Sequence, residues 1–398
     1  MADFYINKLP TFSLLYEEST QNMEKQLLEE ASRIPMGVLI PALYPDLSSP
    51  AMKNIIQVLS AMQLVKKVYI CLDKASLDEY QASKEIVAPL GSKCSLIWND
   101  SLKVRELVTE IEQKLSVGIR GKGHAVWTGL GYVIARSEVS ALAFHDADIL
   151  TYSKDLLIRL LYPIVSLKYQ FSKGYYIRYN NQFYGRVVRL FYFPFVRALK
   201  DIFGNTEYID YMGDFRYPLS GEFATFVSQA RILQFPSDWG IEVGILGEIF
   251  RNMRTHRICQ IELVTRYDHK HQKMGSETEG GLYTMAADIA RTFFTFMAGN
   301  GKVIGHDTFN AVRHAYLKNA REIVSVYESF SEMYSDKISF DYHSEMSAIE
   351  MFASSIDSAV KQFYENPQGS VLIPDWKRVE SAIDGVLDKL ATAVENPV

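Results

Sequence analysis

MGVLIPAL at residues 36–43 and VKKVYICL at residues 65–72 are short apolar runs with the length and composition of buried strands. Between them, residues 52–62 carry apolar side chains at helical spacing. A third apolar run, CSLIW at residues 94–98, follows a Gly-Ser turn. This β-α-β-α-β order predicts a parallel sheet and therefore an α/β fold.

The chain that follows predicts a ligand site at one edge of this sheet. Helical spacing continues over residues 102–115 and 124–135, with a glycine-rich turn between them. Residues 139–144 then predict a strand that ends in His145-Asp146-Ala147-Asp148. Ligands of open α/β sheets bind at the carboxyl ends of the strands, so we expect a site around these residues.

Beyond residue 281 the pattern changes to long helical segments, over residues 282–297, 307–333, 343–365 and 375–394. We therefore expect a catalytic domain over residues 1–281 and a helical C-terminal region over residues 282–398. The apolar stripes of these helices need partners, so they cover the catalytic layer or form a dimer interface.

Composition narrows the class of protein. The net charge of −5 gives no general attraction to nucleic acid. Three widely spaced cysteines, Cys71, Cys94 and Cys259, suit free thiols in a reducing compartment. The first 20 residues lack the apolar core of a signal peptide, and we expect no transmembrane segment. The expected location is the cytoplasm.

Asp146 and Asp148 are candidate ligands for a divalent cation. They are two carboxylates separated by one residue after an apolar strand. Mg²⁺ or Mn²⁺ held by one or two carboxylates can bridge the oxygens of a diphosphate and neutralise the charge of that leaving group. The structural alternative is a solvated turn before a helix that begins near Ser153.

Three other segments carry candidate binding groups. Gly121-Lys122-Gly123 combines a point charge with backbone that a ligand can approach, or it is an ordinary turn. The segments Ser220-Gly221-Glu222 and Asp238-Trp239-Gly240-Ile241-Glu242 place carboxylates beside small residues, which suits sugar hydroxyls. For the second of them, helix capping by Ser237 or Asp238 is the alternative.

Basic residues supply candidates for phosphate and metal contacts. His269 and His271 lie in a basic segment and suit a metal ligand and an anion contact, although surface histidines are the simpler reading. Arg178, Arg186 and Arg189 lie among tyrosines, where guanidinium forks can match phosphate or carboxylate oxygens.

These motifs occur together and in one order: Pro41-Ala42-Leu43, Gly121-Lys122-Gly123, Asp146-Ala147-Asp148, Gly185-Arg186-Val187, Ser220-Gly221-Glu222, Gly240-Ile241-Glu242 and His269. The series resembles the glucosyl-3-phosphoglycerate synthases and the similar mannosyl-3-phosphoglycerate synthases, over roughly residues 30–300. That resemblance implies a GT-A fold, Rossmann-like and nucleotide-sugar-binding, with a helical C-terminal extension. It also implies a retaining glycosyltransferase with a divalent metal, a nucleotide-sugar donor and a small phosphorylated acceptor, and we expect a homodimer.

The resemblance implies roles at matching positions. Pro41, Ala42, Leu43 and Asp46 would bind the nucleoside, with Lys122 and Asp146 near the nucleotide. Asp148 and His269 would hold the metal, and Trp239 and Glu242 would meet the donor sugar. Lys122, Asp148 and Glu242 would be the catalytic set, and Gly185, Arg186, Val188 and His271 would receive the acceptor.

Some positions depart from the family pattern. Tyr44-Pro45-Asp46 replaces Asn-Glu, Val188 replaces a hydroxyl residue, and His271 replaces an asparagine. The expected reaction is glucose transfer from UDP- or GDP-glucose to 3-phosphoglycerate. The alternatives are GDP-mannose or another small acceptor on the same scaffold, and a non-catalytic binder of nucleotide sugars.

Overall fold

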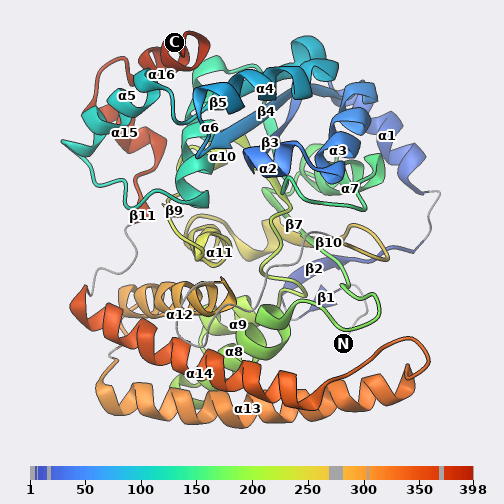
Figure 1. The fold of residues 1–398 in the computed structure, drawn as a ribbon, viewed down its shortest axis with the longest axis vertical. Helices are drawn as coiled ribbons and strands as arrows, with labels where there is room; N and C mark the ends of the chain where they lie inside the picture. Colours follow the sequence, from blue (N-terminus) through green and yellow to red (C-terminus); the bar gives the residue numbers. More distant parts are fainter. Residues whose placement is uncertain are drawn as a thin grey trace.

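The computed structural model describes residues 5–6, 8–15, 19–268, 281–302, 304–366 and 372–397. A mixed nine-stranded sheet crosses the α/β part of the molecule in the order β1-β2-β10-β7-β8-β6-β3-β4-β5 (Figure 1). Its strands are β1 (Tyr5–Ile6), β2 (Leu9–Phe12), β3 (Met36–Leu43), β4 (Val65–Asp73), β5 (Cys94–Trp98), β6 (Ala141–Phe144), β7 (Phe171–Tyr175), β8 (Phe223–Phe226) and β10 (Ile258–Glu262).

The predicted parallel arrangement is confirmed for β3, β4, β5 and β6. Strand β8 is different, because it runs antiparallel to both β6 and β7. Its four residues are too short a pattern to indicate a direction. In this register Phe223 lies opposite Phe144, so the residues that enter β8 lie beside the residues that leave β6.

Helices cover both faces of the sheet because both faces are apolar. One hydrophobic cluster joins the sheet to α1 (Ser19–Glu30), α3 (Pro50–Ala61) and α7 (Lys154–Val165). The other joins it to α5 (Leu102–Glu112), α6 (Lys122–Arg136) and α11 (Ile241–Asn252), and continues into the C-terminal helices. The second cluster therefore connects the two regions of the chain.

Three long C-terminal helices pack below the sheet in Figure 1, namely α12 (Gly281–Gly299), α13 (His306–Met333) and α14 (Tyr342–Glu365). They confirm three of the predicted helical segments. Helix α8 (Phe193–Phe203) packs against α13. These contacts bury Phe309, Val312, Tyr316 and Val324 of α13.

The fourth predicted helix, 375–394, is wrong as a single element. It is two helices, α15 (Trp376–Ala382) and α16 (Val386–Glu395), because Ile383 is extended and ends α15, and Gly385, with a φ of 66°, precedes α16. Helix α16 packs against α5 and α6, and Lys389 pairs with Glu110 at 2.6 Å. The end of the chain thus returns to the α/β layer, where β11 (Leu372–Ile373) also pairs with β9 (Phe235–Pro236).

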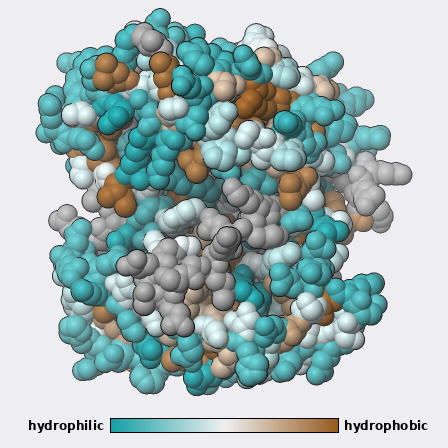
Figure 2. Space-filling view, in the orientation of Figure 1, coloured by the Kyte–Doolittle hydropathy of each residue, from teal (hydrophilic) through white to brown (hydrophobic). Residues whose placement is uncertain are grey.

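The face in Figure 2 is mostly hydrophilic, with apolar side chains scattered over it. Within the described ranges, no helix combines the length and the apolar composition that crossing a bilayer requires.

Candidate active site

Lys122, Asp146 and Glu242 form a charged cluster at the carboxyl edge of the sheet. Lys122 Nζ lies 2.8 Å from Asp146 Oδ1 and 2.9 Å from Glu242 Oε1. Burial disfavours the charged amine, but the two carboxylates outweigh burial and raise the pKa of Lys122. The ammonium therefore stays protonated at neutral pH and holds the two carboxylates together.

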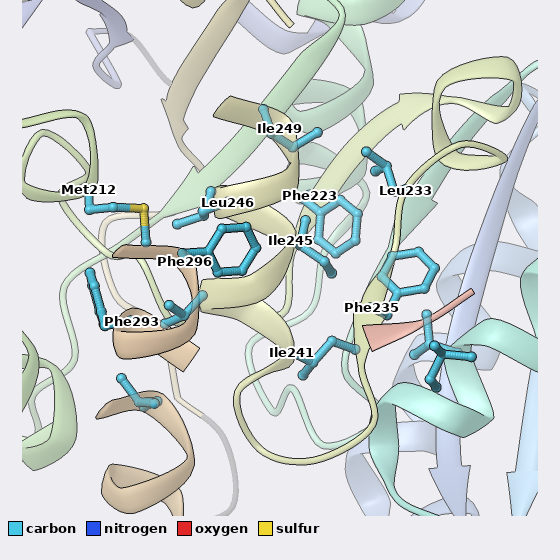
Figure 3. Close-up of a cluster of buried hydrophobic side chains, with 14 of the residues drawn as sticks. Met212, Phe223, Leu233, Phe235, Ile241, Ile245, Leu246, Ile249, Phe293 and Phe296 are labelled. Atoms are coloured by element: carbon cyan, nitrogen blue, oxygen red, sulfur yellow. The ribbon is translucent and has the colours of Figure 1, made fainter. Parts of the chain in front are cut away.

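The three side chains come from different elements. Lys122 is the first residue of α6, Asp146 follows β6 in the loop, and Glu242 lies in the first turn of α11. Figure 3 shows α11 seated in a cluster of buried apolar side chains, in which Ile241, Ile245 and Leu246 of the helix lie among aromatic rings. This packing fixes the helix that carries Glu242.

The glycines around Lys122 have a structural role. A Cβ on Gly121 would lie 2.4 Å from the Ser237 carbonyl oxygen, and one on Gly123 would lie 1.9 Å from that of Pro236. A side chain at either position would meet protein backbone, so these glycines are required for close packing. They bring Lys122 against the segment that leads to Glu242.

Arg120 anchors the loop before Lys122, a role that the sequence analysis missed. Its guanidinium lies 2.6 Å from Asp100 Oδ1 and 2.6 Å from Asp73 Oδ1, at the end of β4. Hydrogen bonding to Asp100, helped by Asp73, raises the pKa of Arg120. The acidic end of the β4 strand was the available signal, but its partner could not be read from the sequence.

Asp146 lies against a glycine of the neighbouring strand connection. A Cβ on Gly221 would lie 2.3 Å from Asp146 Oδ2. His145, next to it, is fully buried, and burial lowers its pKa to about 3 despite the adjacent Asp146. The imidazole is therefore neutral at physiological pH.

Glu222 does not face a sugar site, which corrects the prediction for Ser220-Gly221-Glu222. Its side chain is fully buried and accepts hydrogen bonds from Tyr176 Oη at 2.9 Å and Tyr267 Oη at 2.7 Å. The two tyrosine rings stack with centroids 3.6 Å apart. Glu222 is thus a structural carboxylate beneath the site.

Lys173 is a second buried amine near the cluster that sequence reasoning missed. Its Nζ donates to the Ser220 carbonyl at 2.6 Å. Burial lowers its pKa to about 8, against the opposing effect of Glu242 and Glu222. A lysine within the short apolar strand β7 was the only sequence signal.

Asp148 lies after β6 and is partly exposed. The residues just after it contact Asp268. Leu150 N donates to the Asp268 carbonyl at 2.9 Å, and Asp268 N donates to Thr151 Oγ1 at 3.2 Å. His269 and His271, the predicted metal and acceptor contacts, lie outside the described residues.

No group of three or more His, Cys, Asp or Glu side chains within the described ranges could hold a metal ion. Mg²⁺ commonly binds proteins through one or two carboxylates together with substrate phosphates, so it does not require such a group. The partly exposed carboxylate of Asp148 fits an open site of this kind.

The predicted donor residues lie around the same edge. Pro41 lines a cavity of about 20 Å³ together with Lys122, Asp146 and Glu242. Ala42 is buried, whereas Leu43 is 42% exposed at the end of β3 and Trp239 is 37% exposed before α11. Asp46 lies in α2 (Tyr44–Leu47). A larger cavity of about 520 Å³ borders Ser237, Asp238 and Arg291 but not Lys122.

Asp238 makes contacts that hold the loop just before α11. Its Oδ1 accepts from Gly240 N at 2.8 Å, and its Oδ2 accepts from Arg291 Nη2 at 2.6 Å. Asp288 of α12 also pairs with Arg291, at 3.1 Å. Asp238 therefore has structural partners. The capping alternative is wrong, because α11 has Gly240 as its N-cap, without a side-chain cap hydrogen bond.

Three of the predicted acceptor residues, Gly185, Arg186 and Val188, lie at the start of a π-helix (Val187–Tyr192) that packs against the C-terminal helices. Gly185 has a φ of 72°, which favours glycine. Arg186 Nε donates to Glu345 Oε1 of α14 at 2.9 Å, and Arg189 pairs with the same carboxylate. Val188 is buried. Glu345 was not among the predicted residues.

No protein-family model matches the sequence. A glucosyl-3-phosphoglycerate synthase from Persephonella marina is 39% identical over 399 residues, which cover 99% of this chain and 98% of the relative. A protein of the same name from Methanococcoides burtonii is 34% identical over 404 residues, with 98% and 96% covered.

Two solved structures share the fold. Glucosyl-3-phosphoglycerate synthase from Mycobacterium tuberculosis, in complex with Mn²⁺, UDP and glucosyl-3-phosphoglycerate, matches with a TM-score of 0.54 at 21% identity, covering 73% of this chain and 88% of that chain. Mannosyl-3-phosphoglycerate synthase from Rubrobacter xylanophilus matches with a TM-score of 0.55 at 16% identity, covering 74% and 83%.

The predicted GT-A-like α/β fold with C-terminal helices is thereby confirmed. Family membership rests on the sequence relatives, which match from end to end at identities above 30%. The chain is a glycosyltransferase, and it belongs to the glucosyl-3-phosphoglycerate synthase family.

Proposed function

We propose that this chain transfers glucose from UDP-glucose to 3-phosphoglycerate, with retention at the anomeric carbon, to give glucosyl-3-phosphoglycerate. The observation that carries the proposal is Lys122, which joins Asp146 and Glu242 at the edge where nucleotides bind to α/β sheets. The names of the full-length relatives support the acceptor, and a fold neighbour was solved with UDP-glucose and phosphoglyceric acid.

The Lys122 ammonium has one N–H left that can donate a hydrogen bond to an oxygen of the nucleotide sugar. An ammonium group carries three donors, and Asp146 and Glu242 take two of them. In the proposal Asp146 meets the nucleotide and Glu242 the glucose hydroxyls, so Lys122 fixes the spacing between the two halves of the donor. Trp239 lies beside the sugar, and the nucleoside contacts are Pro41, Ala42, Leu43 and Asp46.

Asp148 and His269 are the proposed ligands of Mg²⁺ or Mn²⁺. When bound, the ion neutralises charge on the departing diphosphate. Asp148 supplies a carboxylate oxygen, the ligand type that these ions prefer. The hydrogen bonds of Asp268 to Leu150 and Thr151 tie the chain just before His269 to the loop that carries Asp148.

The proposed reaction needs no covalent protein intermediate. The bond from the anomeric carbon to the diphosphate oxygen breaks while the acceptor hydroxyl oxygen attacks from the same face. The hydroxyl proton passes to the departing phosphate oxygen. Glu242 and Lys122 orient the sugar and stabilise the leaving group, while Gly185, Arg186, Val188 and His271 receive the acceptor.

UDP release tests this proposal. We expect release from UDP-glucose that depends on both 3-phosphoglycerate and Mn²⁺, and little from GDP-mannose. Asp148→Asn should lower turnover at least about 100-fold, because the charged carboxylate that would hold the metal ion is lost. Release that ignores the acceptor, or an Asp148→Asn enzyme with full metal-dependent turnover, contradicts it.

We further propose that the protein is cytoplasmic and that it forms a homodimer. We also propose that the catalytic domain ends at residue 281, where the helical region begins. The free cysteines Cys71, Cys94 and Cys259 support a reducing compartment. Exposed apolar residues at the end of α13 support self-association, and include Phe330 and Met333.

A further inference from the structure

Arg186 and Arg189 meet one carboxylate that comes from the C-terminal region. Arg186 Nε donates to Glu345 Oε1 at 2.9 Å, and Arg189 Nη1 donates to Glu345 Oε2. Glu345 lies in the first turn of α14, 159 residues after Arg186. Helix α14 therefore reaches the start of the π-helix Val187–Tyr192, where the proposed acceptor contacts lie.

Other contacts hold the same arrangement. Arg186 Nη2 donates to Ser344 Oγ at 2.9 Å, from the same turn of α14. The Arg189 guanidinium lies 4.8 Å from the ring centroid of Tyr327 in α13, and Ser339 N donates to the Asn181 carbonyl at 2.8 Å. Helices α13 and α14 and the connection between them thus contact the segment 181–189 at several points.

The charges at this point do not cancel. Two guanidiniums face one carboxylate, which leaves one positive charge in excess. The side chains of Arg189 and Glu345 are 5% and 4% exposed, whereas that of Arg186 is 24% exposed. Buried like charges need a counter-ion, so Glu345 allows both arginines to stay in place.

The geometry also selects which edge of Arg186 is available. Glu345 and Ser344 engage its Nε–Nη2 edge. The adjoining Nη1–Nη2 edge is then the one that a phosphate or carboxylate can approach in a bidentate manner. A guanidinium is planar, so fixing one edge fixes the direction of the other.

We propose that Glu345 is a positioning residue of the acceptor site, which holds Arg186 in the orientation that binds the anionic group of the acceptor. This inference rests on the proposed function. It assigns to the C-terminal region a direct share in the acceptor site, since α14 delivers the carboxylate.

Acceptor kinetics test the inference. Wild-type transfer to 3-phosphoglycerate is measured first, and its absence overturns the proposed function and this inference with it. Given transfer, Glu345→Gln should raise the KM for 3-phosphoglycerate about tenfold, the worth of one oriented charge-assisted hydrogen bond, and leave the KM for UDP-glucose unchanged. An unchanged or lowered acceptor KM overturns the inference alone.

Glu350→Gln is the matched control. Glu350 lies on the same helix and pairs with Arg321 at 3.1 Å, with both side chains more than half exposed. This variant should leave both KM values unchanged. An acceptor KM raised equally in Glu350→Gln would assign the effect to α14 in general and overturn the specific role of Glu345.

Two further variants separate positioning from folding. Ser344→Ala keeps the buried carboxylate and should raise the acceptor KM about twofold, even if Glu345→Gln lowers the melting temperature. In an Arg186→Lys background, which lacks the guanidinium edge, Glu345→Gln should cause no further rise. Independent, multiplying effects of the two substitutions would show that Glu345 does not act through Arg186.

Discussion

Gly221 illustrates how one residue sets the position of a proposed donor contact. The strand register brings Gly221 beside Asp146, where a methyl group would lie 2.3 Å from Asp146 Oδ2. The carboxylate also holds Lys122 at 2.8 Å. A side chain at position 221 would therefore move Asp146 and disturb the ammonium between Asp146 and Glu242.

We expect Gly221→Ala to lower kcat/KM for UDP-glucose about 100-fold, a loss that displacing a substrate-positioning group by about 1 Å can cause. Steady-state UDP release measures this change in kcat/KM. Gly299→Ala is the control, because an added Cβ there meets nothing within 4 Å, and it should retain wild-type activity. Wild-type activity in Gly221→Ala would show that Asp146 does not need its observed position.

At the scale of elements, α12 and the loop before α11 are joined through one cation. Arg291 pairs with Asp238 at 2.6 Å and with Asp288 at 3.1 Å. Burial, reinforced by Asp238, raises the pKa of Asp288 from 3.8 to about 7. Asp288 also accepts a hydrogen bond from Trp239 N, so its protonation state bears on the loop that leads to Glu242.

This shift predicts a pH dependence of stability. Between pH 3.8 and about 7 the folded state binds a proton at Asp288 that the unfolded state has lost. The contribution of Asp288 to the free energy of unfolding therefore falls as pH rises through this window and levels off above it. Asp288→Asn removes the titration, so it should gain stability relative to wild type as the pH is raised.

Urea unfolding near the two ends of this window measures the effect. Asp357→Asn is the control, because Asp357 pairs with Arg313 on the surface and its side chain is 58% exposed. The difference in free energy of unfolding between Asp357→Asn and wild type should change little with pH. If the difference between wild type and Asp288→Asn is the same at both pH values, Asp288 does not titrate there.

At the scale of the whole molecule, the end of α13 carries exposed apolar side chains. Val326 and Phe330 are 44% exposed, Met333 is 75% exposed, and Tyr334 is 45% exposed. Their spacing of three and four residues places them on one side of the helix. Exposed apolar side chains on one side of a helix suit an interaction surface, and a second copy of the chain is the proposed partner.

Light scattering after size exclusion should give twice the chain mass of 45.4 kDa for the wild type. A Phe330→Glu, Met333→Glu double variant should elute as a single chain, because burying unpaired charge in the interface is costly. Leu102→Glu, at an exposed apolar position on α5, should remain a dimer. A single-chain mass for the wild type refutes the dimer, and a dimeric double variant refutes this interface.

The sequence by itself determined the α/β layer and placed Asp146 and Asp148 just after the strand β6. The strands at residues 36–43 and 94–98 match β3 and β5 from end to end, because apolar periodicity records which side chains are buried. Asp146 and Asp148 could be placed because a strand end followed by carboxylates is a local pattern. The ordered motifs then indicated the family, which the full-length relatives confirmed.

Only the tertiary structure decided which residues meet. Glu222 looked like a sugar contact, yet two tyrosines from other segments donate hydrogen bonds to it, and Gly121 and Gly123 lie against the backbone of residues 236–237. Arg186 pairs with Glu345, which lies 159 residues later in the sequence. Local periodicity indicates which side chains are buried, but it does not identify the distant residues that bury them. The ion pairs and the antiparallel direction of β8 are therefore known only from the folded chain.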